Sequence, residues 1–278
     1  MSADYFMPAE LDEAFTLLKT HDLAIVAGGT DYFPARGRAP LTQNILDLSR
    51  LHQLQRLDLT ETHLEIGAGV TWTKLVNAEL PNAFLGLQAA GREVGSIQIQ
   101  NAGTIVGNIC NASPAADGMP PLLTLDAEVR IASQSGDRLE PLHQFITGVR
   151  HTTLQPGEIV VGLRIHMPPA HVTGAFQKLG ARRYLVISIA MTAVVIGVDD
   201  QGHVDFARIA VGACSAVAQR LRDLENDLLG QRPDSINITA DHLAPLAPIT
   251  DIRGDATYRL GIVSTHIQRA INEAVHHG

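Results

Sequence analysis

Residues 23–31 read LAIVAGGTD, a short apolar run that ends in a pair of glycines. The four apolar residues at 23–26 predict a buried β-strand. Gly28 and Gly29 allow the backbone after this strand to adopt positive φ, and without a Cβ successive N–H groups can converge on an anion. Such a turn is also common where no ligand binds. The stretch therefore predicts a strand followed by a glycine loop that could hold a phosphate.

A second loop, at residues 101–117, also carries glycines among small polar residues. It reads NAGTIVGN at 101–108 and NASPAAD at 111–117. The surrounding segment, 95–121, is rich in Gly, Asn, Ser and Pro and has little helical periodicity. It predicts a long ordered loop, which in a compact domain is usually functional. Two such loops could clamp a pyrophosphate from both sides; the alternative is a hairpin followed by a helix that Asp117 caps.

Several common sites are excluded because their motifs are missing. Neither loop contains the G-x-G-x-x-G of a Rossmann unit or the Gly-Lys-Ser/Thr of a P-loop, so a nucleotide would be held in another way. Twelve histidines occur without an H-E-x-x-H or Cys-x-x-Cys motif, and no G-x-S-x-G marks a nucleophile. We therefore expect no metal ligands and no catalytic acid, base or nucleophile. Cys110, inside the second loop, is expected to be a buried small apolar side chain rather than a reactive thiol.

The composition is that of an ordinary soluble globular protein. The 278 residues include 21 Lys and Arg against 29 Asp and Glu, which gives a net charge of −8. This length predicts two domains. An acidic chain is unlike nucleic-acid-binding proteins, which cluster Lys and Arg. The two cysteines, Cys110 and Cys214, are too few for an iron–sulfur cluster, which needs about four ligands.

The N-terminus and the longest apolar stretch both argue against a membrane protein. Asp4 stands where a secretory signal would carry Lys or Arg. The stretch at 187–198 has about 12 residues, against the ~20 that span a bilayer. We expect a cytoplasmic protein with no membrane and no nucleic-acid partner.

Hydrophobic spacing predicts the order of elements along the chain. Two prolines in the linker MPPA, at 167–170, cannot continue a strand ladder. Before the linker, helices are expected at 11–18 and from Thr71 to about Leu80, and strands at 23–26, 45–48, 57–59, 64–66, 128–132 and 158–166. Beyond it, strands are expected at 175–179, 189–198 and 204–211, and helices at 216–229, 240–247 and 256–274. This order predicts an α+β unit with a three-stranded antiparallel sheet and a helical layer on one face.

The combined motifs resemble the FAD-binding (medium) subunit of the molybdenum hydroxylase family, which includes the flavoprotein subunits of xanthine dehydrogenase and carbon monoxide dehydrogenase. The resemblance covers nearly the whole chain, and its motifs are GGTD at 28–31, GAGVT at 67–71, TIVGN at 104–108 with NASPAAD at 111–117, and DIRGDATYR at 251–259. It implies a two-subdomain FAD-binding domain of the vanillyl-alcohol-oxidase type at residues 1–168. It implies a second domain, of the CO dehydrogenase flavoprotein C-terminal type, at residues 172–278.

The resemblance also implies a cofactor site for FAD, bound non-covalently. The first two loops would hold the pyrophosphate, and Asp117 would lie near the ribose or adenine. A cation at Lys178, beside the isoalloxazine, would stabilise the anionic reduced flavin; the alternative is a solvated surface lysine. The implied cofactor-binding residues are Val26, Ala27, Gly28, Gly29, Thr30, Asp31, Tyr32, Thr104, Gly107, Asn108, Asn111, Ser113, Asp117, Ile159, Val160 and Lys178.

Three positions depart from the family pattern. Val106 replaces a glycine, so its backbone should avoid positive φ and approach phosphate less closely. Gln100 stands where an arginine is common. Ala89 falls near the place of the aromatic residue that covers the flavin in xanthine dehydrogenase, so we expect another residue, Tyr184, to shield the ring.

The resemblance implies an electron-transfer subunit of an oxidoreductase. Electrons would pass from 2Fe-2S clusters on a small partner subunit, supplied by a molybdopterin-binding large subunit, through FAD to NAD or another acceptor. The sequence leaves two alternatives open. One is a stand-alone FAD-dependent reductase, and the other is a non-catalytic assembly subunit that has lost FAD.

Overall fold

The computed structural model describes residues 3–183 and 185–277. Its N-terminal part holds a small parallel sheet in the order β1-β3-β2, formed by Tyr5–Phe6, Asn44–Asp47 and Leu23–Val26. The helices here are α1 (Leu11–Thr20) and α2 (Tyr32–Arg36), and β1 was not predicted. Because β2 and β3 are parallel, their carboxyl ends meet at one edge, and the first glycine loop leaves the sheet there.

A five-stranded antiparallel sheet follows, in the order β4-β5-β10-β6-β7. The predicted strands are confirmed, whereas β7 was missed. In this order the strands are Leu57–Leu59, His63–Gly67, Ile159–His166, Glu128–Ser133 and Gly136–Pro141. A two-stranded ribbon of β8 (Ile146–Gly148) and β9 (His151–Thr152) and the short helix α8 (Leu142–Phe145) complete this region.

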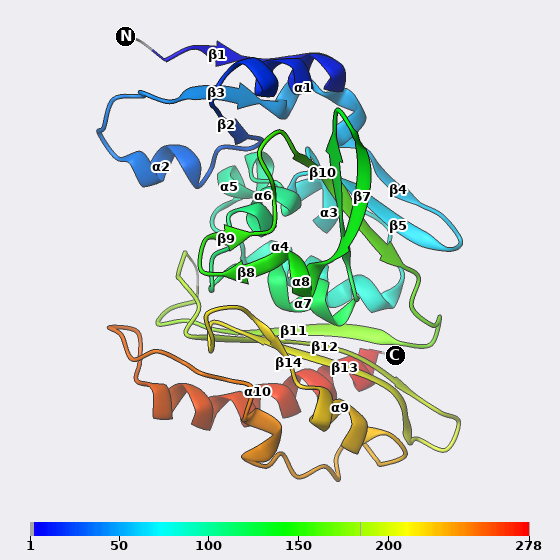
Figure 1. The fold of residues 1–278 in the computed structure, drawn as a ribbon. Coiled ribbons are helices and arrows are strands. Elements are labelled where there is room, and N and C mark those ends of the chain that lie inside the picture. The colour runs from blue at the N-terminus through cyan, green and yellow to red at the C-terminus, as the bar shows by residue number, and fades with distance from the viewer. Residues whose placement is uncertain (1–2, 184, 278) are drawn as a thin grey trace.

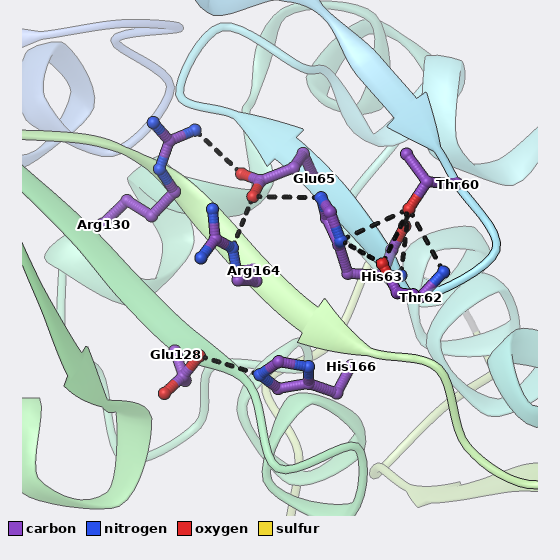
Figure 2. A network of polar contacts seen from close by, with 8 residues as sticks. All are labelled: Thr60, Thr62, His63, Glu65, Glu128, Arg130, Arg164 and His166. Atoms are coloured by element: carbon purple, nitrogen blue, oxygen red, sulfur yellow. Dashed lines mark hydrogen bonds and ion pairs between the residues drawn. The ribbon is translucent and has the colours of Figure 1, made fainter.

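One face of this sheet carries a network of charged side chains (Figure 2). The Glu65 carboxylate accepts hydrogen bonds from Arg130 at 2.8 Å and from Arg164 at 2.6 Å. Beside it, His63 lies 3.7 Å from Glu65, and His166 lies 3.5 Å from Glu128. The side chains that alternate with these, such as Ile66 and Val129, are buried. The sheet is therefore polar on one face and apolar on the other, as expected of antiparallel strands with one solvated face.

The segment predicted as one long loop is largely helical. It contains α5 (Ile97–Ala102), α6 (Ile105–Cys110) and the start of α7 (Met119–Thr124), preceded by α4 (Leu85–Glu93). Each of these helices has nine residues or fewer, which is too short for periodicity to identify. The predicted cap of α3 (Trp72–Val76) is confirmed, because the Thr71 hydroxyl accepts a hydrogen bond from Lys74 N at 3.2 Å. Short 3-10 helices lie at Leu48–Arg50, His52–Gln55, Asn82–Phe84 and Asp241–Leu243.

The C-terminal part is an antiparallel sheet with four strands, in the order β11-β12-β13-β14, rather than the three predicted. The extra strand, β14, has only two residues. Of the predicted helices, 240–247 forms only a 3-10 turn, because its ends carry no helix caps and a proline interrupts it at Pro245. The elements are β11 (Thr173–Leu179), β12 (Ala190–Val198), β13 (Val204–Gly212), β14 (Gln219–Arg220), α9 (Arg222–Leu228) and α10 (Ala256–His277).

Helices cover both faces of this sheet (Figure 1). Helices α9 and α10 pack on one face, and α4 and α7 of the preceding region pack on the other. Consequently nearly every residue of β12 is buried. The 3-10 turn before α4 lies very close to β11, since a Cβ on Gly174 would be 2.3 Å from the Ala83 carbonyl oxygen. Among the described residues, no helix is both long and apolar enough to cross a membrane.

Candidate functional site

The two glycine loops predicted from the sequence lie against each other. A Cβ on Gly28 would stand 2.0 Å from the carbonyl oxygen of Ala102, and a Cβ on Gly103 would stand 3.1 Å from the Thr30 hydroxyl. Real Cβ atoms do not approach a backbone oxygen this closely, so only glycine fits at position 28. The contact brings together segments more than 70 residues apart in the sequence.

Backbone hydrogen bonds hold the second loop beside α3. Trp72 N donates to the Gly103 carbonyl at 3.1 Å, and Ile105 N donates to the Val70 carbonyl at 3.2 Å. Thr104 caps α6, since its hydroxyl accepts a hydrogen bond from Gly107 N at 3.0 Å. The first residues of α3 and α6, capped by Thr71 and Thr104, therefore lie side by side.

A cavity of about 310 Å³ opens beside the paired loops. Lys74 is the only Lys or Arg among its lining residues, and its ammonium donates to the Gln55 carbonyl at 2.5 Å. Lys74 was not expected from the sequence to be a site residue, although it lies one helical turn after the predicted cap Thr71. The lining residues are Ala27, Gly28, Ser49, Gln55, Gly69, Thr71, Lys74, Ala102 and Thr104.

Several other predicted residues shape the loops. Gly29 adopts a φ of +65°, as a glycine turn requires. Val106 is buried inside α6, and its φ is not positive, as expected for a valine at this position. The Asn108 amide oxygen accepts a hydrogen bond from Gly118 N at 3.3 Å and so ties the second loop to α7. Asp31 precedes α2, whose first residue Tyr32 receives a hydrogen bond from Arg36 at 3.4 Å.

Asn111 is held by a residue distant in the sequence, and Ser113 by a neighbour. The Asn111 side chain and carbonyl both accept hydrogen bonds from Arg150. The Ser113 hydroxyl accepts one from Ala115 N at 3.3 Å. Cys110, the last residue of α6, is exposed as a residue, so the expectation of a buried residue was wrong. Burial of the thiol group itself raises its pKa to about 12, which agrees with the expectation that the thiol is not reactive.

Asp117 and Lys178 form a buried ion pair. Their Oδ2 and Nζ atoms are 2.8 Å apart, and their side chains are 12% and 7% exposed. Lys178 also donates to the Glu93 carbonyl at 3.2 Å, and the Ser188 hydroxyl donates to Asp117 Oδ1 at 3.0 Å. Burial raises the pKa of the Asp117 carboxyl, while Lys178 and Ser188 oppose this shift by stabilising the ionised form.

This pair bears on two of the expectations from the sequence. Lys178 is not a solvated surface lysine, because it is almost fully buried against Asp117. Asp117 also cannot lie at the adenine end of an extended dinucleotide while Lys178 lies at its isoalloxazine end, since their side chains are in contact. Sequence reasoning missed this because the two residues are 61 positions apart and on different elements.

A second cavity, of about 370 Å³, lies beside Lys178. Ala89 lines this cavity, whereas Tyr184, expected to shield the ring, lies outside the described residues. Ile159 and Val160 are buried in β10 and line neither cavity. The lining residues are Ala89, Glu93, Phe176, Gln177, Lys178, Leu179, Gly180, Arg182, Arg183 and Val186. Within the described part of the chain, no cluster of three His, Cys, Asp or Glu side chains could hold a metal ion.

Two family models match this chain and together cover most of it. Residues 1–169 match the model "FAD binding domain in molybdopterin dehydrogenase", and residues 175–274 match "CO dehydrogenase flavoprotein C-terminal domain". The chain is 34% identical to the nicotinate dehydrogenase FAD-subunit of Eubacterium barkeri, over 82% of this chain and 79% of that protein. It is 31% identical to caffeine dehydrogenase subunit beta of Pseudomonas sp. (strain CBB1), over 98% and 96%.

A solved structure shares the whole fold. A chain of reconstituted CO dehydrogenase from Oligotropha carboxidovorans superposes with a TM-score of 0.89 at 26% identity, covering 99% of this chain and 98% of that one. The architecture of a FAD-binding domain followed by a C-terminal flavoprotein domain is thereby confirmed, and FAD is the cofactor. The chain belongs to the medium, FAD-binding subunits of the molybdenum hydroxylase family, and is thus an oxidoreductase subunit, as its motifs predicted.

Proposed function

We propose that this chain holds FAD against its two glycine loops and relays electrons from partner iron–sulfur clusters to NAD or another acceptor. The observation that carries the proposal is the contact between Gly28 and Ala102, which brings both loops to one cavity. When bound, FAD supplies the capacity to accept an electron pair and pass it on. The chain itself binds and orients the cofactor and sets the charge around it.

The residues fit a dinucleotide at the loops. Gly28, Gly69 and Thr104 line the cavity, and the Lys74 ammonium places a positive charge there that suits a diphosphate. Around the second cavity, Lys178 and Ala89 suit the ring system. The proposed binding set is the one implied by the family motifs, with Lys74 added; Ile159 and Val160 would contact the cofactor through the β10 backbone, because their side chains are buried.

Partner subunits follow from the same proposal. Cys110 and Cys214 are both free thiols, one exposed and one buried, and two cysteines cannot hold an iron–sulfur cluster. The clusters would therefore lie on a small 2Fe-2S subunit, and molybdopterin on a large subunit. The division into domains at 1–168 and 172–278 belongs to the proposal as well, supported by family matches at 1–169 and 175–274.

The visible spectrum of the purified chain tests the proposal. The chain reconstituted with FAD and then desalted is expected to keep the absorbance bands of bound flavin. Loss of all flavin on desalting, from the chain alone and from its complex, contradicts the proposal and favours the assembly subunit without FAD. Turnover of NADPH with a small substrate by the isolated chain favours the stand-alone reductase.

Lys74→Met tests which cavity receives the diphosphate. Loss of the ammonium removes one charge-assisted contact at a solvent-accessible site, so the Kd for FAD should rise by about threefold to tenfold. The measurement is a fluorescence titration at low salt, and the effect should shrink as salt increases. Lys19→Met is the matched control, since Lys19 lies in the last turn of α1 and lines neither cavity. Equal affinities for wild type and Lys74→Met place the diphosphate away from this cavity.

A further inference from the structure

A chain of polar contacts runs from the Asp117–Lys178 pair into the C-terminal sheet. Its middle member is Ser188, which is only 1% exposed and lies two residues before β12. The Ser188 hydroxyl donates to Asp117 Oδ1 at 3.0 Å. Its own carbonyl accepts a hydrogen bond from Arg253 at 2.9 Å. Ser188 thus joins the buried carboxylate to the segment at 251–259.

That segment clamps the backbone on which Ser188 stands. Arg253 binds the Ser188 carbonyl, and the fully buried Arg259 donates to the next carbonyl, that of Ile189, at 2.6 Å. Asp251 holds both guanidinium groups, with contacts of 2.6 Å to Arg253 and 2.7 Å to Arg259. Two consecutive carbonyls are therefore fixed by two arginines that share one carboxylate.

We infer that the segment 251–259 acts through Ser188 as a positioning element that keeps Asp117 ionised against Lys178 and so sets the net charge facing bound FAD. This inference rests on the proposed function for the location of FAD beside Lys178. The clamp itself is a property of the protein without cofactor. It gives the DIRGDATYR motif, in a different part of the chain from the glycine loops, a role at the cofactor site.

The physical argument concerns the ionisation of Asp117. Among the described residues, the charged groups that act on its carboxyl include Lys178 from β11 and Glu93 from α4, with Arg253 one hydrogen bond further away behind Ser188. Burial and Glu93 favour the protonated carboxyl, while Lys178 and the Ser188 hydroxyl favour the carboxylate. When Asp117 is ionised it cancels the charge of Lys178. When Asp117 is protonated, the ammonium is uncompensated and favours the negative charge that bound FAD gains on reduction.

The first experiment follows the titration of Asp117 in the protein without FAD, by the carboxyl ¹³C chemical shift. In Ser188→Ala the carboxylate loses one hydrogen bond, so its titration midpoint should rise by about one pH unit. Arg253→Gln should move it in the same direction by less. Because Arg253 is inferred to act through Ser188, the double variant should match Ser188→Ala alone rather than add the two shifts. Ser235→Ala, which changes an exposed serine in the loop after α9, is the matched control and should leave the midpoint unchanged.

The second experiment follows the midpoint potential of bound FAD against pH in the complete complex. At pH values between the two Asp117 midpoints, Ser188→Ala should have the higher potential, and far above both midpoints it should equal the wild type. An unchanged Asp117 titration in Ser188→Ala, or additive shifts in the double variant, overturns the inference. If Ser188→Ala does not fold, Ser188→Cys keeps the volume and replaces the hydroxyl with a weaker donor, so a smaller shift is expected. Failure of the wild type to retain FAD contradicts the proposed function instead, and the titration without cofactor still decides the positioning role.

Discussion

Gly29→Val is expected to abolish retention of FAD, with a rise in Kd of at least about a hundredfold. Gly29 has a φ of +65°, which a β-branched residue adopts only under strain of about 1–3 kcal/mol. A Cβ at this position would also lie 2.6 Å from the Phe33 ring. The loop would have to change its backbone, and its N–H groups would no longer converge on the diphosphate. Desalting after reconstitution, followed by the visible spectrum, measures the loss.

A matched variant separates the loop from a general effect of strain. Gly230 has a φ of +78° and nothing within 4 Å of its would-be Cβ. Gly230→Val therefore carries a similar backbone strain at a position remote from the site, after the end of α9. It should lower the thermal stability and still retain FAD. Wild-type affinity for FAD in Gly29→Val, or equal loss in both variants, contradicts the placement of the cofactor at this loop.

Arg259→Leu is expected to destabilise the fold by about 3–5 kcal/mol, because it removes one partner of a buried network. Arg259 is fully buried, and it donates to the carbonyls of Ile189 and Ala213 at 2.6 and 3.1 Å and to Asp251 at 2.7 Å. A leucine removes these donors from the two buried carbonyls, while Asp251 keeps its hydrogen bonds from Arg253. The thermal midpoint should fall by roughly 6–12 °C, as measured by calorimetry.

An exposed arginine provides the control for this change. Arg222 is exposed at the first position of α9, where a positive charge opposes the helix dipole. Arg222→Leu should change the stability by less than about 0.5 kcal/mol. If Arg259→Leu melts within a degree or two of Arg222→Leu, Arg259 does not anchor the start of β12.

Local sequence was sufficient for the elements whose causes are local. The strand at β2, the glycine turn after it and the Thr71 cap each depend on neighbouring residues, and each was predicted correctly. The short helices α5 and α6 were missed because one or two turns leave no readable period, and their stability comes from packing. The strand β14 was missed because two residues show no alternation, and only their pairing with β13 makes them a strand.

The sequence by itself indicated the family and the cofactor, through motifs that resemble those of known FAD-binding subunits, and it located the two glycine loops, because glycine permits the tight turn that follows a strand. Only the tertiary structure decided which of these residues meet. It brought Gly28 against Ala102, added Lys74 to the cavity, and paired Asp117 with Lys178. The reason is physical: a buried charge needs a partner of opposite charge, and the packing of the segment before α7 against β11, rather than distance along the chain, brings that partner to Asp117.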